Sequence, residues 1–291
     1  MMKHFFSMGM LGLFLMTVGC VACSKDDDVT SSETINPGND PNFTIVANTD
    51  GVLKSFNRKV KVFGIDIYAV AGVTDAKLLH AANVMAQYLD NDEDGTVDNQ
   101  LVVDKMVENK ASLVMWKKES DLNINPPSDR EIQDLGNDET IPAFVANGKT
   151  GQFDAALEEV WHIITHAGYA AAYPAIFGEE AGTVLSDAMD VARGGSFSSI
   201  PNPYPSTAWY TYDDATCTYD CQSTEYFYWA MTSILGAQAN RSGEINQEWK
   251  LHTKALVMEK DNAIYTLLTD AKYKLPTKLP DGSYTINFLT K

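Results

Sequence analysis

Two glutamates and two histidines follow one another at helical spacing in the segment EEVWHIITH. Glu158, Glu159, His162 and His166 fall on one stripe of a helix, because successive helical residues are rotated by about 100°. Two imidazoles at positions i and i+4 can hold one metal ion from the same face. The spacing therefore predicts a metal site on a helix over 152–169. The alternative is a half-buried helix whose histidines pair with neighbouring carboxylates.

The segment HIITH resembles the HExxH helix of zincin metallopeptidases, with Ile163 where that motif has its glutamate. A later segment, TEYFYW, resembles the TxEFFAE-like helix of metallopeptidases related to anthrax lethal factor. The resemblance implies a zinc site in which Glu225 joins His162 and His166. Because position 163 carries no carboxylate, the general base has to come from elsewhere. Glu159, one helical turn earlier, is the nearest candidate.

An aromatic loop over 196–220 precedes the second of these segments and supplies Tyr219 or Tyr212 to face a tetrahedral oxyanion. In the expected mechanism zinc polarises a carbonyl and lowers the pKa of its water towards about 7. The sequence thus predicts a zinc-dependent, peptidase-like metallohydrolase with Glu159 and Tyr219 as catalytic residues. The alternative is a non-catalytic surface protein that binds a glycan or peptide on exposed aromatic rings and keeps a degenerate metal site.

The acidic segment DNDEDGTVD has the alternation of a calcium-binding loop. The expected ligands are Asp90, Asp92, Asp94, Thr96 and Asp98. Gly95 permits the tight turn, and Thr96 at position 7 offers its backbone carbonyl. Predicted helices on both sides fit an EF-hand, but Leu101 occupies position 12, so the stretch more closely resembles the DxDxDGxxD loops of thrombospondin type-3 repeats. We expect a structural Ca²⁺ site, and the alternative is a solvated acidic turn.

Cys217 and Cys221, four residues apart, are predicted to form a disulfide, because paired cysteines in an oxidising compartment are usually oxidised. The alternative is a pair of thiolate metal ligands.

The first 22 residues are typical of a lipoprotein signal peptide. A basic start precedes an apolar run over 5–18 that is too short to span a bilayer as a helix. The residues that follow resemble a lipobox, which implies lipidation of Cys23, with Cys20 as the alternative. The tract SKDDD resembles the surface-export signal of some lipoproteins. We therefore expect a lipid anchor in the outer membrane of the cell envelope, with the protein exposed at the surface or facing the periplasm.

The remaining chain divides into a flexible tether over 23–42 and one domain over 43–291. A net charge of −17 argues against nucleic acid as a partner. The pattern predicts an α+β fold, zincin-like and mainly helical with a small β-sheet. The expected strands cover 43–47, 59–70, 111–116 and 141–146, and the main helices 75–88, 101–109, 152–169, 181–192 and 223–238. The run from FGIDIYAV through YLDNDEDG to TEYFYW also resembles a family of uncharacterised secreted and lipoprotein domains.

Overall fold

The computed structural model describes residues 40–51, 53–125 and 127–286. The predicted signal peptide, both candidate lipidation sites, Cys20 and Cys23, and most of the tether lie outside the described residues. None of the described helices is long and apolar enough to cross a membrane.

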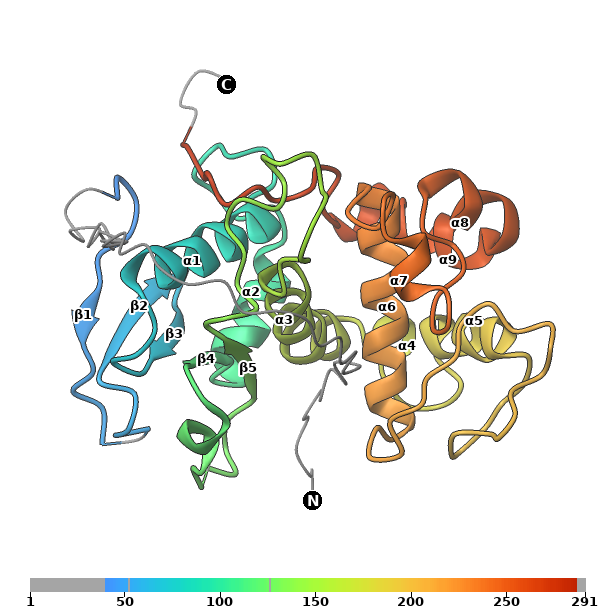
Figure 1. Cartoon of the computed structure of the whole chain (residues 1–291), viewed down its shortest axis with the longest axis horizontal. Helices are drawn as coiled ribbons and strands as arrows, with labels where there is room; N and C mark the ends of the chain where they lie inside the picture. Colours follow the sequence, from blue (N-terminus) through green and yellow to red (C-terminus); the bar gives the residue numbers. More distant parts are fainter. Residues whose placement is uncertain (1–39, 52, 126, 287–291) are drawn as a thin grey trace, which may run out of the picture.

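A mixed β-sheet forms one side of the described domain (Figure 1). In chain order, which is also their spatial order, its five strands are β1 (Val46–Ala47), β2 (Arg58–Val62), β3 (Ile65–Ala69), β4 (Ser112–Trp116) and β5 (Ile132–Gly136). The pairs β1–β2 and β2–β3 are antiparallel, whereas β3–β4 and β4–β5 are parallel. A parallel pair needs a long crossover connection, and two helices fill the one between β3 and β4.

The helices divide into a group beside the sheet and a group farther away (Figure 1). Beside the sheet lie α1 (Asp75–Leu89), α2 (Gln100–Glu108) and α3 (Ala156–Ile164). The second group contains α4 (Pro174–Phe177), α5 (Val184–Arg193), α6 (Tyr219–Leu235), α7 (Ser242–Ile245), α8 (Lys254–Lys260) and α9 (Asn262–Leu268). Because α3 contacts β4 and β5 as well as α6, it joins the two halves. The predicted combination of a small sheet with mainly helical structure is confirmed.

Two of the predicted strands differ from the structure. The segment 59–70 is not one strand but the hairpin of β2 and β3, which turns at Phe63 and Gly64, both with positive φ angles (46° and 96°). A bulky residue such as phenylalanine is uncommon at positive φ, so the sequence carries no recognisable turn signal there. The predicted strand at 141–146 is wrong, because that segment forms turns; the edge strand is instead β5, in the polar sequence IQDLG.

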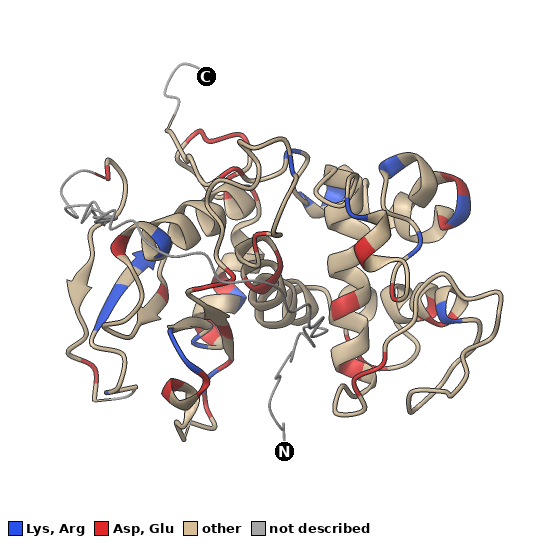
Figure 2. Ribbon diagram, viewed as in Figure 1, with Lys and Arg blue, Asp and Glu red and all other residues tan. Residues whose placement is uncertain are grey.

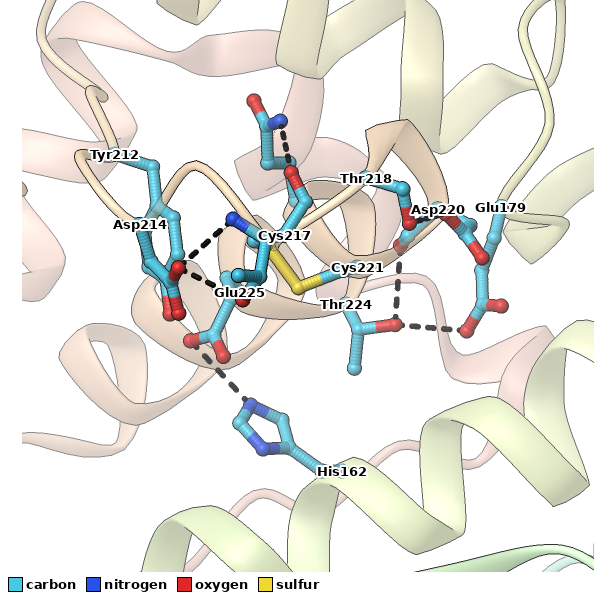
Figure 3. The surroundings of a disulfide bond; sticks show 12 residues. His162, Glu179, Tyr212, Asp214, Cys217, Thr218, Asp220, Cys221, Thr224 and Glu225 are labelled. Atoms are coloured by element: carbon cyan, nitrogen blue, oxygen red, sulfur yellow. Dashed lines mark hydrogen bonds and ion pairs between the residues drawn. A yellow bond between two sulfur atoms is a disulfide. The ribbon is translucent and has the colours of Figure 1, made fainter. Parts of the chain in front are cut away.

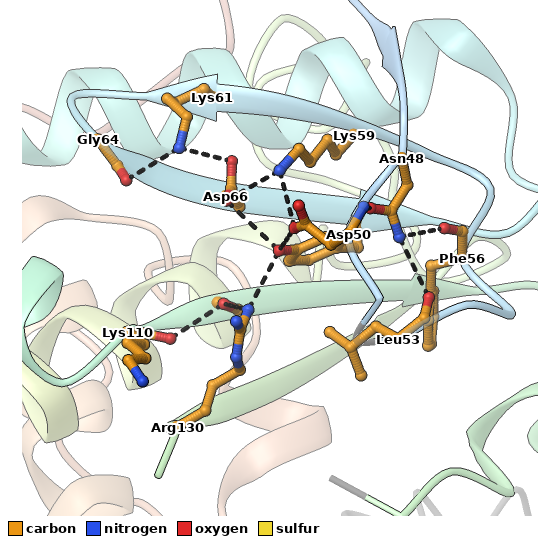
Figure 4. Close-up of polar contacts among 12 residues, drawn as sticks. Asn48, Asp50, Leu53, Phe56, Lys59, Lys61, Gly64, Asp66, Lys110 and Arg130 are labelled. Carbon is orange, nitrogen blue, oxygen red and sulfur yellow. Dashed lines mark hydrogen bonds and ion pairs between the residues drawn. The ribbon is translucent and has the colours of Figure 1, made fainter. Parts of the chain in front are cut away.

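A network of charged and polar groups ties the hairpin to the segment that leads into β5 (Figure 4). Lys59 Nζ lies 2.9 Å from Asp50 Oδ2 and 3.2 Å from Asp66 Oδ2. The Tyr68 hydroxyl donates to Asp50 (2.7 Å) and accepts from Arg130 Nη1 (3.1 Å). The hydrogen bond from Tyr68 and the charge of Lys59 lower the pKa of Asp50. The network fixes the hairpin against the neighbouring parallel strands.

The helix predicted over 152–169 is interrupted. It begins at Ala156, and after Ile164 it continues as a π-helical segment, Thr165–Ala170. A π-helix has i→i+5 hydrogen bonds, so residues in that segment take different angular positions from those of a continuous α-helix. His166 lies in the π-helical segment and His162 before it, which alters the geometry expected from the i, i+4 spacing.

Candidate metal centre

His162 and Glu225 face each other across the contact between α3 and α6 (Figure 3). The His162 side chain is only 5% exposed, and its Nε2 atom is buried without a hydrogen-bond partner. That atom lies 3.6 Å from Glu225 Oε2, too far for a hydrogen bond of ordinary length. A buried nitrogen with no partner, opposite a buried carboxylate, is an arrangement that a bound cation would complete.

The position of His162 follows from how α3 is built. One face of the helix is apolar and buried, with Val160, Trp161 and Ile164 all fully enclosed. Glu158 and Glu159 occupy the first turn, where negative charge is favourable because of the helix dipole. Since the buried apolar face fixes the rotation of α3, Glu158 and His162 turn towards the boundary with α6, while Glu159 reaches Gln133 on β5.

Glu158, Glu159 and His162 form one group, in which ligand atoms of the three side chains lie within 4.8 Å of one another. Glu159 Oε2 is 3.3 Å from His162 Nδ1 and accepts a hydrogen bond of 2.5 Å from Gln133 Nε2 on β5. Glu159 is buried, whereas Glu158 is half-buried. Figure 2 shows acidic residues on both α3 and α6. The group therefore concentrates negative charge in a region of low solvent access.

The carboxyl groups at this boundary resist ionisation. Burial raises the pKa of Glu225 to about 8, and the neighbouring Glu158 and Glu159 add to the rise while His162 opposes it. Burial, with a contribution from Glu159, raises the pKa of Glu158 to about 7. Burial also raises the pKa of Glu159 well above its ordinary value, assisted by the charges of Asp134 and Glu139. A divalent cation would offset this repulsion and favour the ionised forms.

His166 is held apart from this group by two other carboxylates. Its Nδ1 lies 2.8 and 2.9 Å from the two oxygens of Glu179, and its Nε2 lies 3.2 Å from Glu131 Oε2. Burial alone would lower the pKa of His166, but hydrogen bonds to Glu131 and Glu179 raise it to about 10. A protonated imidazole cannot ligate a metal, because both ring nitrogens then carry hydrogens. Thr224 of α6 donates to Glu179 (2.8 Å) and completes the arrangement.

The three expected zinc ligands are thus not gathered around one point. Among residues 40–51, 53–125 and 127–286, two groups of at least three His, Cys, Asp or Glu side chains have the proximity that a metal ion needs. One contains His162 with Glu158 and Glu159, and the other lies in the acidic loop. His166 belongs to neither group, and Glu225 lies beside the first, with its Oε2 atom 3.6 Å from His162 Nε2.

The two candidate tyrosines differ in position. Tyr219 packs towards α5, where its ring centroid lies 5.6 Å from the guanidinium of Arg193. Ser186 and Asp190, which also belong to α5, influence the pKa of the Tyr219 hydroxyl. Tyr212 lies on the Glu225 side (Figure 3). Burial and then the charge of Glu225 raise the pKa of Tyr212 above its ordinary value. Tyr212 is therefore better placed than Tyr219 to meet a ligand at His162.

The predicted disulfide between Cys217 and Cys221 is present, and it joins the aromatic loop to the first turn of α6. Glu225 follows Cys221 by one helical turn. Gln222 Nε2 donates to the carbonyl of Cys217 (2.9 Å), and the Tyr210 hydroxyl donates to that of Gln222 (2.8 Å). These bonds fix the start of the helix that carries Glu225.

Rings of the aromatic loop are largely covered by the helices. Tyr210 is fully buried and packs against Tyr226, with ring centroids 5.5 Å apart. Trp209 is half-buried, and its Nε1 donates to Asp261 (2.8 Å) at the start of α9. These rings therefore belong mainly to the hydrophobic core, whereas Tyr212 is half-buried and lies beside the candidate metal centre.

The acidic loop connects α1 to α2 and forms the second group, Asp90, Asp92 and Asp94. Asp90 is fully buried, and its two oxygens accept the backbone N–H groups of Asp94 (3.1 Å) and Gly95 (2.8 Å). Gly95 has a φ of +87°, as the predicted tight turn requires. Asp98 lies outside the group and accepts the backbone N–H of residue 91 (2.7 Å), while the Thr96 side chain is exposed.

A segment near the C-terminus is bound to this loop, which the sequence did not indicate. The Tyr284 hydroxyl donates to Asp90 Oδ2 (2.5 Å). Asn91 Oδ1 accepts the backbone N–H groups of Thr277 (2.8 Å) and Lys278 (2.9 Å). Burial raises the pKa of Asp90, although the hydrogen bonds from Tyr284 and from the backbone N–H groups of Gly95 and Asp94 oppose the rise. None of the described residues of this segment, 274–286, is in a strand.

Gln133, Glu131 and Glu179 were not among the candidates from the sequence, although Glu131 and Glu179 contact His166 and Gln133 donates to Glu159. They lie 13 to 35 residues from these partners, in segments without a recognisable motif. Comparison of the chain with protein-family models, with curated proteins and with solved structures finds no match.

Proposed function

We propose that the protein binds a divalent transition metal, with zinc the expected ion, between α3 and α6 and acts there as a peptidase-like hydrolase. The observation that carries the proposal is the buried His162 Nε2, which has no hydrogen-bond partner and lies 3.6 Å from Glu225 Oε2. Two ligand atoms about 2.1 Å from one tetrahedral ion lie about 3.4 Å apart. The separation between these two atoms therefore fits joint coordination after a small adjustment.

The Glu158–Glu159 pair supplies the remaining groups of the proposed centre. A carboxylate of this pair would complete the ligand set or accept a proton from the attacking water. Ile163 is 1% exposed and packed in the core, so no base comes from the position used in HExxH. A bound divalent cation would supply Lewis-acid polarisation of a carbonyl and a water acidic enough to attack at neutral pH. Tyr212 would donate a hydrogen bond to the oxygen that gains charge.

The second candidate is a calcium-stabilised binding protein for a peptide or glycan at the cell envelope, in which the metal centre does not catalyse. The specific observation in its favour is the engagement of His166 by Glu131 and Glu179, which leaves one histidine where zincins use two. In both versions the lipid anchor, the outer-membrane location and a Ca²⁺ ion held by Asp90, Asp92 and Asp94 belong to the proposal. A strongly acidic surface would disfavour nucleic acid in both.

The metal content of the purified protein tests the proposed centre. Purified protein, dialysed and measured by elemental mass spectrometry, is expected to hold close to one equivalent of zinc or another transition metal. His162→Gln should lose it, whereas the half-buried His252→Gln is the matched control and should keep it. His166→Gln should retain metal in this geometry, in contrast to the ligand set that the sequence suggested. No transition metal in the wild-type protein would refute the centre.

Activity then separates the two candidates. Metal-loaded protein is assayed against a peptide library, and Glu158→Gln and Glu159→Gln are compared with the wild type. Removal of the proton acceptor should lower the rate by a factor of about 10²–10⁴. Bound metal without turnover of any peptide would instead favour the binding protein.

A further inference from the structure

Within the proposed metal centre, on which this step rests, we infer that Glu159 is a positioning residue and neither ligand nor base. Gln133 fixes its carboxylate, and the carboxylate holds the proton of His162 on Nδ1. The Nε2 lone pair is thereby directed at Glu225 and at the cation. Glu158 and Glu159, which the sequence does not distinguish, thus have different roles.

The first step is that one oxygen of Glu159 has two partners. Gln133 Nε2 donates to Glu159 Oε2 at 2.5 Å, and His162 Nδ1 lies 3.3 Å from the same oxygen. Gln133 comes from β5, on the other side of α3 from α6. The carboxylate is therefore anchored towards the sheet, away from the helix that carries Glu225.

The second step concerns the tautomer of His162. Burial raises the pKa of Glu159, so its ionised form is the one favoured by a cation bound nearby or by alkaline pH. In that form the carboxylate only accepts hydrogen bonds, whereas a neutral imidazole has one N–H donor and one acceptor nitrogen. A hydrogen on Nδ1 makes the contact with Glu159 a hydrogen bond. A hydrogen on Nε2 would instead set the Nδ1 lone pair against the Glu159 oxygen. The first tautomer leaves Nε2 with a free lone pair, which agrees with its lack of a hydrogen-bond partner.

The third step is that the imidazole of His162 cannot easily flip, which would exchange the positions of Nδ1 and Nε2. The Tyr228 ring meets the imidazole edge-on, with centroids 5.4 Å apart, and His162 is 4% exposed. A carboxylate that fixes the tautomer and orientation of a histidine ligand is the usual outer partner of a metal centre. Glu158, which is half-buried and not bonded to Gln133, is then the carboxylate left to meet the cation or its water.

The test reads the proton on the imidazole directly, in metal-free protein. Histidine is labelled with ¹⁵N, and two-bond ¹H–¹⁵N correlations are recorded at alkaline pH; His162→Gln identifies the signal. The wild type and Glu158→Gln should show the Nδ1–H tautomer. Glu159→Leu, which removes the acceptor, should lose that preference. An Nε2–H tautomer in the wild type, or an unchanged tautomer in Glu159→Leu, would overturn the inference.

A titration with Zn²⁺ supplies the second readout. Loss of such an outer partner typically weakens metal binding by about 10–100-fold. Glu159→Leu should show a weakening of this size with one equivalent still bound at saturation. Gln133→Met leaves the sequence of α3 unchanged and should weaken Zn²⁺ binding by a smaller factor. It therefore checks that the weaker binding of Glu159→Leu does not come from a folding defect. Complete loss of binding in a folded Glu159→Leu would make Glu159 a ligand and overturn the inference. Failure of the wild type to bind Zn²⁺ would refute the proposed function. The tautomer of His162 in metal-free protein would still show whether Glu159 orients the imidazole.

Discussion

In metal-free protein, Glu225→Gln should change the pH dependence of stability more than any single surface substitution. Burial raises the pKa of Glu225 from 4.5 to about 8, so the folded state binds a proton that the unfolded chain has already released between these values. Stability therefore falls as pH rises through this window, starting above the unfolded pKa and ending above the folded pKa. At about 1.4 kcal/mol for each tenfold change in the equilibrium constant, the loss reaches up to about 5 kcal/mol.

Glutamine has the shape of the protonated glutamate but no proton to lose, so Glu225→Gln should be spared this loss. The free energy of unfolding is measured by urea denaturation in the presence of a chelator, at several pH values between 5 and 8. The variant should gain on the wild type as pH rises, whereas the exposed Glu180→Gln should follow the wild type. Parallel curves for wild type and Glu225→Gln would show that the carboxyl is not held in its neutral form, and the electrostatic argument for the centre would fail. Added Zn²⁺ should restore stability mainly at the alkaline end, because metal binding requires the ionised carboxylate.

Three further outcomes are expected. Asp92→Asn combined with Asp94→Asn should abolish stabilisation by Ca²⁺, which in the wild type amounts to about 2.7 kcal/mol at a hundredfold excess over Kd; a melting temperature unaffected by chelator in the wild type would exclude the site. Replacing Cys217 and Cys221 with serine should lower the free energy of unfolding by only about 2 kcal/mol, because the closed loop is short. Urea denaturation measures this loss, and a thiol assay of the native protein shows whether the two cysteines are bonded. Cys23→Ser should release the protein from membranes in a fractionation assay, and release by substitution of the cysteine three residues earlier instead would move the processing site.

The sequence predicted those features that depend on neighbours in the chain. The helix α1 begins at Asp75, Gly95 turns the acidic loop, and Cys217 and Cys221 are bonded, all as local signals indicate. The pairing of His162 with Glu225 was also anticipated, although only through a resemblance of two short segments.

What the sequence could not provide depends on distant contacts. The sequence around His166 does not indicate that its two ring nitrogens form hydrogen bonds with Glu179 and Glu131, because these residues come from other segments of the chain. The π-helical segment has no accepted sequence signal, yet it changes the direction in which His166 points relative to His162. The polar strand β5, which supplies Gln133, lacks the alternation by which strands are recognised.

The attachment of the C-terminal segment to the acidic loop has a consequence for the order of folding. Helices α1 and α2 with the turn between them can form from adjacent residues, but Tyr284 reaches Asp90 across a separation of 194 residues. The opposite end of the described chain meets the same segment, since Asn42 Nδ2 donates to the carbonyl of Tyr284 (2.7 Å). Closing so long a loop is slow compared with local helix formation. We expect the acidic loop to reach its final geometry late in folding, after the segment 277–284 has reached it, so that Asn42, this segment and the loop become ordered in one step.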